Sequence, residues 1–330
     1  MFGLDPVLFW FVATALFANF LNGFNGSANS VATMIASRAM RPSRALLLSA
    51  VAHFLGPLLS GVAVATAIGS TVLQRNASQL PVVWAALLAT LVWSILASLV
   101  GVPSSYSHAL MGGLTGAALA GYGLAGIKPA GMLRVLVILF TSPLLGIVAG
   151  YLLMRLVLFL CRAATPRVNN FFRRAQIVTA TALAFSHGSN DAQKTMGLVT
   201  MGLLAREVIP TFAVPVWVVM ACAASIALGT ALGGWRVITT LGRRFYKIRP
   251  IHSFTSQLAS SAIIFGAGLL GGPVSTSQIV STTILSVGAA ERMNKVRWGV
   301  MRQISAAWFV TIPAVAALAA LFYLFLEKMV

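Results

Sequence analysis

Long apolar stretches separated by short polar breaks run along the whole chain. A helix needs about 20 apolar residues to cross the hydrocarbon core of a bilayer, and most of these stretches approach or exceed that length. They cover residues 6–21, 45–72, 81–102, 133–160, 177–204, 208–232, 254–270 and 300–326. Residues 235–248 instead alternate bulky apolar and basic side chains, as an interfacial amphipathic helix does. The pattern predicts an all-α polytopic membrane protein.

The two halves of the chain present the same parts in the same order. Each begins with an apolar stretch that polar residues interrupt, at residues 22–26 and 187–194, so we expect a discontinuous helix in each half. Residues 101–108 align with residues 271–278 at an offset of 170, and Pro143 and Pro313 keep that offset. Matching interruptions in two hydrophobic halves are typical of secondary transporters, whose substrate site lies near the membrane midplane. We expect one transporter domain over residues 1–330, with repeat one over about 1–160, a basic central loop over about 161–174 and repeat two over about 175–330.

Two proline-led segments, residues 103–108 and 273–278, carry clusters of hydroxyl side chains. Non-helical backbone at membrane depth has to line a cavity, so each segment predicts a re-entrant hairpin. Proline favours the first turn of a helix, and the free N–H groups at a helix start favour an anion. We therefore expect two helix starts, one in each repeat, to converge on one tetrahedral oxyanion. The candidate anion-binding residues in these segments are Ser104, Ser105, Ser107, Ser275, Thr276 and Ser277.

Composition supports a membrane protein and excludes several other classes. The 330 residues are 58% hydrophobic and 8% charged, whereas a soluble domain carries about 25% charged residues. This composition excludes an ordinary soluble enzyme, a disordered protein and a coiled coil. The net charge of +18 comes mostly from cations clustered between apolar stretches, which is typical of cytoplasmic loops rather than of a nucleic-acid-binding surface. We expect a multi-pass protein of the cytoplasmic membrane, in contact with lipid, with no nucleic-acid partner and no enzymatic activity.

A second group of polar residues suits a cation. Asp191 and Lys194 lie three residues apart and can pair on one helical face, and an ionisable residue within a span predicts a functional site. Asp191 offers a carboxylate for a cation or a transported proton, and amide oxygens offer neutral ligands. The candidate cation ligands, for Na⁺ if it is the coupling ion, are Asn25, Asn29, Asn190 and Asp191, with Lys194 as charge partner. Asn25 and Asn190 are also candidate substrate ligands.

These segments resemble the signatures of the inorganic phosphate transporter (PiT) family. Residues 187–197 resemble the family's H-G-[AS]-N-D-A-Q-K-[ST]-M-G, residues 103–110 its P-S-S-x-S-H-A-L, and residues 273–278 its P-V-S-T-[ST]-H. The resemblance extends over about residues 15–320. It implies two inverted-topology repeats, phosphate held between two re-entrant hairpins, cations held near the N-D motifs, and a homodimer.

The chain departs from the family pattern at two positions. Gly26 stands where the first signature usually has an aspartate, and Gln278 stands where histidine is common in the second hairpin. Gly26 removes one carboxylate from the proposed cation sites. The sequence therefore favours sodium coupling less, and proton coupling more, than the family pattern does.

The sequence therefore predicts a secondary transporter of inorganic phosphate, coupled to Na⁺ or H⁺ by alternating access, with no resident cofactor. A sulfate permease on the same scaffold is the nearest alternative, because a hydroxyl cradle alone does not separate the two oxyanions. A passive anion channel and a non-transporting phosphate sensor also stay open from the sequence alone.

Overall fold

The protein is a bundle of helices, as predicted. A computed structural model describes residues 5–101, 104–243 and 245–328, and within them the regular structure is helical. Helices α1 to α12 cover Pro6–Ala36, Pro42–Leu59, Ala63–Thr71, Leu80–Val100, Tyr106–Tyr122, Pro129–Leu160, Val168–Ala205, Val216–Leu232, Trp235–Arg243, Pro250–Leu269, Thr276–Glu291 and Trp298–Leu326. In the described residues, six helices are long and apolar enough to span a membrane, and the bent pair α8 and α9 adds a seventh candidate.

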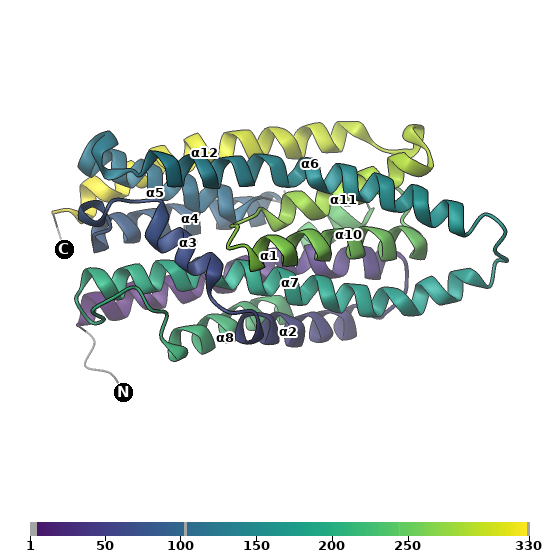
Figure 1. The fold of residues 1–330 in the computed structure, drawn as a ribbon, viewed down its shortest axis with the longest axis horizontal. Coiled ribbons are helices and arrows are strands. Elements are labelled where there is room, and N and C mark those ends of the chain that lie inside the picture. Colours follow the sequence, from purple (N-terminus) through teal and green to yellow (C-terminus); the bar gives the residue numbers. More distant parts are fainter. Residues whose placement is uncertain (1–4, 102–103, 244, 329–330) are drawn as a thin grey trace.

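The helices of the two halves pack against each other in matching pairs. Helix α1 packs on α8 as α7 packs on α2, and α5 packs on α12 as α11 packs on α6. Corresponding helices run in opposite directions along the bundle, which is visible for α1 and α7 and for α6 and α12 (Figure 1). The two halves are therefore intertwined, and each covers apolar faces of the other.

The predicted interruptions in the first helix of each half are wrong, because α1 and α7 run without a break through residues 22–26 and 187–194. The glycines in these segments allow close helix packing instead. A Cβ atom at Gly23 would lie 2.2 Å from the carbonyl oxygen of Ile226, and one at Gly188 would lie 2.6 Å from Cα of His53. The polar side chains of these segments form hydrogen bonds to neighbouring helices. The backbone of α1 and α7 keeps its regular helical hydrogen bonds.

Other boundaries also differ from the prediction. The apolar stretch over residues 45–72 divides into α2 and α3 at a turn where Gly61 has a φ of +77°. The basic central loop is shorter than expected, because α7 begins at Val168. The predicted amphipathic helix ends at Arg243. Pro103, which begins the first hydroxyl-rich segment, and Arg244 of a basic cluster lie outside the described residues.

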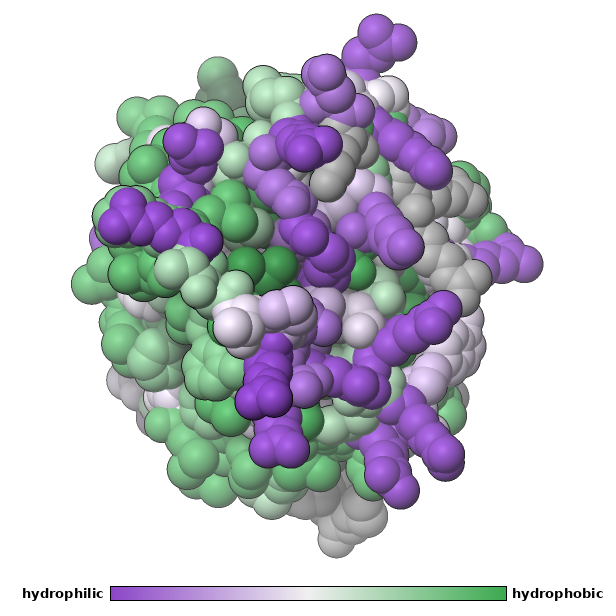
Figure 2. Space-filling model, turned by 90° about the vertical axis from the view of Figure 1, so that its right-hand side faces the viewer, coloured by the Kyte–Doolittle hydropathy of each residue, from purple (hydrophilic) through white to green (hydrophobic). Residues whose placement is uncertain are grey.

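The cationic clusters gather at one end of the bundle. A guanidinium N–H of Arg173 donates to the carbonyl of Arg38, which joins the start of α7 to the residues after α1. Arg249 pairs with Glu291 at the start of α10. Figure 2 looks onto this end and shows hydrophilic side chains spread across it, with apolar side chains around its edge. The positive-inside rule predicts that such an end faces the cytoplasm.

Candidate functional site

Two helices begin at one point in the protein interior. Ser105 is the N-cap of α5 and Ser275 is the N-cap of α11, and their hydroxyl oxygens lie 2.7 Å apart. His108 extends this contact, since its Nδ1 lies 2.7 Å from the hydroxyl of Ser105 and its Nε2 lies 3.3 Å from the amide of Gln278. The two hydroxyl-rich segments therefore meet, and they bring the N-terminal ends of α5 and α11 together.

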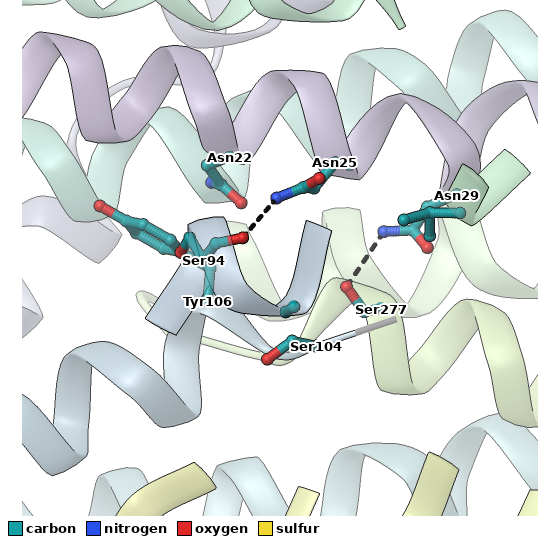
Figure 3. Close-up of a pocket in the computed structure, with 10 residues that line it drawn as sticks. Asn22, Asn25, Asn29, Ser94, Ser104, Tyr106 and Ser277 are labelled. Carbon is teal, nitrogen blue, oxygen red and sulfur yellow. Dashed lines mark hydrogen bonds between the residues drawn. The ribbon is translucent and has the colours of Figure 1, made fainter. Parts of the chain in front are cut away.

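A small polar cavity lies beside this junction (Figure 3). Its volume of about 30 Å³ is enough to hold a water molecule. Amides from α1 form one side, and hydroxyl groups from the α4, α5 and α11 segments form the other. The polar side chains that line it are Asn22, Asn25, Asn29, Ser94, Ser104, Tyr106 and Ser277. The cavity thus joins residues of both halves of the chain.

Three asparagines of α1 face this cavity. Asn22, Asn25 and Asn29 are three and four residues apart, which places them on one face of the helix (Figure 3). The amide nitrogen of Asn25 donates to the carbonyl of Ser94 at 3.2 Å, and that of Asn29 donates to the hydroxyl of Ser277 at 3.1 Å. A carbonyl oxygen only accepts, so Asn25 has to turn its NH₂ group to Ser94. Its buried Oδ1 has no hydrogen-bond partner among the described residues.

A buried ion pair lies next to the cavity. The ammonium of Lys194 is 2.5 Å from Oδ1 of Asp191, which confirms the predicted pairing on one face of α7. Lys194 also donates to the carbonyl of Val274 at 2.9 Å. The carboxylate accepts further bonds from the amide of Asn22 at 3.3 Å and from the hydroxyl of Thr276 at 3.2 Å. The carboxylate charge is therefore neutralised within the protein, and its oxygens bond to α1, α7 and α11.

The sequence-predicted substrate residues divide into two groups. Ser104, Ser277 and Asn25 line the cavity, as does the predicted cation ligand Asn29. The others hold the surrounding segments together: Ser105 and Ser275 join the starts of α5 and α11, Thr276 bonds to Asp191, Ser107 donates to Val274, and Asn190 donates to Gly272. The last two bonds, at 2.9 and 3.1 Å, attach the α10–α11 connection to α5 and α7.

Several residues of this region were not selected from the sequence. Asn22 shares the helical face of Asn25 and Asn29, so a search for helical spacing identifies it. His53 is the one ionisable residue within the apolar stretch over residues 45–72, which is itself a sign of function. Ser94 contributes a backbone carbonyl, and no side-chain pattern in the sequence predicts such a contact.

Within the described part of the chain, no group of three or more histidine, cysteine, aspartate or glutamate side chains is arranged to hold a metal ion. Neutral oxygens are available in the region nonetheless. Like Oδ1 of Asn25, the buried Oδ1 of Asn190 has no hydrogen-bond partner among the described residues. These two amide oxygens suit a weakly held cation or a donor group on a substrate.

A second, larger cavity of about 790 Å³ opens at the basic end of the bundle. Its lining includes Arg38, Lys247 and Arg297. Helix α9 separates the two cavities, because Val237 lines the small one and its neighbour Ile238 lines the large one. One helix, α9, therefore separates the polar cavity from the positively charged vestibule at the basic end of the bundle.

Comparison with known sequences finds close relatives over nearly the full chain. The sequence model of the Phosphate transporter family matches residues 22–319. A protein of Rhizobium meliloti is 40% identical over 320 residues, which are 96% of each chain, and one of Bacillus subtilis is 39% identical over 322 residues with the same coverage. Both are named "Probable low-affinity inorganic phosphate transporter".

A solved structure has the same fold. The match has a TM-score of 0.89 and covers 99% of this chain and 100% of the other, which is titled "The sodium-dependent phosphate transporter". The two sequences are 23% identical, so this likeness establishes the arrangement of helices.

Proposed function

The chain belongs to the phosphate transporter family, and we propose that it carries inorganic phosphate across the cell membrane as a secondary transporter. The proposal includes two inverted-topology repeats that rock around a central site, with uptake coupled to Na⁺ or H⁺. The relatives are named as transporters, which supports transport rather than catalysis. The opposed directions of α1 and α7 and of α6 and α12 support the inverted repeats (Figure 1).

The observation that carries this proposal is the contact between Ser105 and Ser275. It places two helix N-termini together, and each presents free N–H groups and the positive end of a helix dipole. Hydroxyl and amide donors lie around the same point, and Lys194 lies behind it with its charge already paired. Such a site can bind an oxyanion through many neutral donors and still release it.

The free oxygen of Asn25 favours phosphate over sulfate. Hydrogen phosphate carries an O–H group at neutral pH, whereas sulfate carries none. Asn25 lines the cavity, and its buried Oδ1 has no partner among the described residues, so a protonated phosphate oxygen that enters the site can donate to it. A site that accepts a hydrogen bond from a substrate hydroxyl discriminates strongly against analogues that lack it.

The size of the cavity supports alternating access. At about 30 Å³ it admits a water molecule but not a phosphate ion without rearrangement. Phosphate binding therefore requires the hairpins to move relative to α1, and exit to the basic vestibule requires α9 to move. The matching helix pairs of the two halves offer two equivalent ways to open the site, one toward each side of the membrane.

Phosphate uptake into proteoliposomes tests this function. The purified protein is reconstituted, and uptake of radiolabelled phosphate is measured under an imposed Na⁺ gradient, an imposed pH gradient, or neither. Accumulation above the external concentration under one of the gradients is expected. Equilibration without accumulation indicates a passive channel, and binding without flux indicates a sensor; both results contradict the proposal. Stronger uptake of sulfate than of phosphate indicates the sulfate permease instead.

A further inference from the structure

Two fully buried histidines lie behind the cavity and have no part in the transport scheme above. His53 comes from the middle of α2 and His187 from α7, and their rings contact each other. Nε2 of His53 lies 2.8 Å from Nδ1 of His187. Buried polar side chains in a membrane protein are costly and are usually retained for function. The burial of this histidine pair therefore indicates a functional role.

The contact of His53 with the backbone of Ser49 determines which atom donates in each hydrogen bond of the histidine pair. Nδ1 of His53 lies 2.7 Å from the backbone carbonyl of Ser49, which only accepts, so Nδ1 carries the proton. In a neutral ring, Nε2 of His53 is then an acceptor, and Nδ1 of His187 has to donate to it. This leaves Nε2 of His187 as an acceptor. It lies 3.2 Å from the amide nitrogen of Asn29, which donates to it.

The chain of bonds ends at the cavity. The same amide nitrogen of Asn29 also donates to the hydroxyl of Ser277 at 3.1 Å, and both residues line the cavity. Both N–H groups of Asn29 are thus assigned, one to His187 and one to Ser277. The amide of Asn29 is therefore held in one orientation by a series of hydrogen bonds that starts at His53 and passes through His187.

Close packing fixes the ring of His187 in this position. A Cβ atom at Gly26 would lie 2.7 Å from Cε1 and 3.3 Å from Nε2 of His187. The ring therefore lies directly against the backbone of α1, in space that any side chain at position 26 would fill. On the other side, the charged groups that face the ring are Asp191, with Oδ2 3.6 Å from Nε2, and Lys194.

We propose that His53 is a positioning residue for the phosphate site: through His187 it orients the amide of Asn29, so that the N–H that now donates to Ser277 can turn to a bound anion that takes the place of this hydroxyl as acceptor. This inference rests on the proposed phosphate transport and names a residue for it outside every recognised motif. When His53 no longer accepts, the proton of His187 moves to Nε2, which then opposes the NH₂ group of Asn29. The amide has to turn away, and the anion loses one donor.

Three variants of α2 test this role. His53→Leu removes the acceptor, whereas His53→Gln keeps an acceptor oxygen within reach of His187. Ser49→Ala is the matched control, because Ser49 contributes only its backbone carbonyl to the chain of bonds. We expect His53→Leu to raise the KM for phosphate about 10-fold, the loss expected for one hydrogen bond to a charged group, with little change in the maximal rate. His53→Gln and Ser49→Ala should keep the wild-type KM.

A double-mutant cycle separates positioning from general damage. If His53 acts through Asn29, His53→Leu should raise the KM in the wild-type background and add almost nothing in the Asn29→Ala background. Equal effects in both backgrounds, or a lower maximal rate with an unchanged KM, would overturn the inference. Absence of phosphate uptake by the wild-type protein would instead contradict the proposed function itself, so the two failures are distinguishable.

Discussion

Ser105 and Ser275 are 170 residues apart in the sequence, and their hydroxyl groups are hydrogen-bonded at 2.7 Å where α5 and α11 begin. Each serine is the N-cap of its helix, so the contact joins two equivalent positions of the two halves. A small internal cavity lies beside them, between the starts of these two helices and the asparagines of α1.

Removal of the two hydroxyl groups should weaken phosphate binding. Ser105→Ala removes a hydroxyl and the side-chain cap of α5, whereas Ser275→Ala removes a hydroxyl that makes no capping bond to α11. We expect each to raise the KM for phosphate about five- to tenfold. Thr115→Ala is a suitable control, because the hydroxyl of Thr115 bonds within α5 to the carbonyl of Met111 at 2.7 Å. If the KM for phosphate is the same in both serine variants and in the control, the junction of Ser105 and Ser275 is not part of the substrate site.

Asp191→Asn should abolish coupled transport. Part of this effect is structural, because the substitution leaves the buried ammonium of Lys194 without its counter-charge, which typically costs about 3–5 kcal/mol. The double variant Asp191→Asn with Lys194→Met removes both charges and should recover much of the thermal stability in detergent. Uptake driven by a gradient should stay absent in the double variant. Recovery of coupled uptake together with stability would show that the carboxylate serves only the fold.

A side chain at position 26 should displace the ring of His187. Gly26→Asp restores the carboxylate that the family resemblance leads us to expect, but its Cβ atom would lie 2.7 Å from that ring. We expect Gly26→Asp alone to lower uptake. The double variant with His187→Ala makes room for the aspartate, so it should regain uptake with a stronger dependence on Na⁺, although with a raised KM for phosphate because Asn29 loses its partner. Gly266→Ala is the control, since no atom lies within 4 Å of a Cβ at that position. If the double variant responds to Na⁺ and pH as the wild type does, position 26 lies outside the cation site.

Asn25 should set the preference for phosphate over sulfate. In Asn25→Ala the acceptor for the phosphate hydroxyl is lost, so the KM for phosphate should rise at least 10-fold while inhibition by sulfate changes less. Sulfate competition against radiolabelled phosphate measures both quantities in one assay. Asn169→Ala, on the exposed first turn of α7, provides the control. An unchanged ratio of the two affinities in Asn25→Ala would place discrimination elsewhere.

The sequence predicted most of the helices and several residues that the fold brings together around the cavity. The length of the apolar stretches identified the spans, because the bilayer core sets the length of a helix that crosses it. The offset of 170 between Ser105 and Ser275 predicted two equivalent helix starts, and these do meet. The pairing of Asp191 with Lys194 followed from their spacing on one helical face.

The sequence did not predict features that depend on contacts between distant helices. Gly23 and Gly188 were interpreted as helix breaks, although they are places where α8 and α2 approach too closely for a side chain. The contact of Asn25 with the carbonyl of Ser94 involves a backbone group, which leaves no trace in the residue types. The partner of His53 is 134 residues away in the chain, so no local pattern connects it to the site.

Determination of the structure with bound phosphate tests the central claim most directly, since the claim is that the anion binds where α5 and α11 begin. An experimental density map of the protein in a membrane mimetic with phosphate, compared with one without it, locates the ion. The account predicts density within hydrogen-bond distance of Ser104, Ser277 and Asn25, with the hairpins moved apart to make room. Phosphate bound only in the basic vestibule beside Arg38 and Arg297, with the junction of Ser105 and Ser275 unchanged, would contradict it.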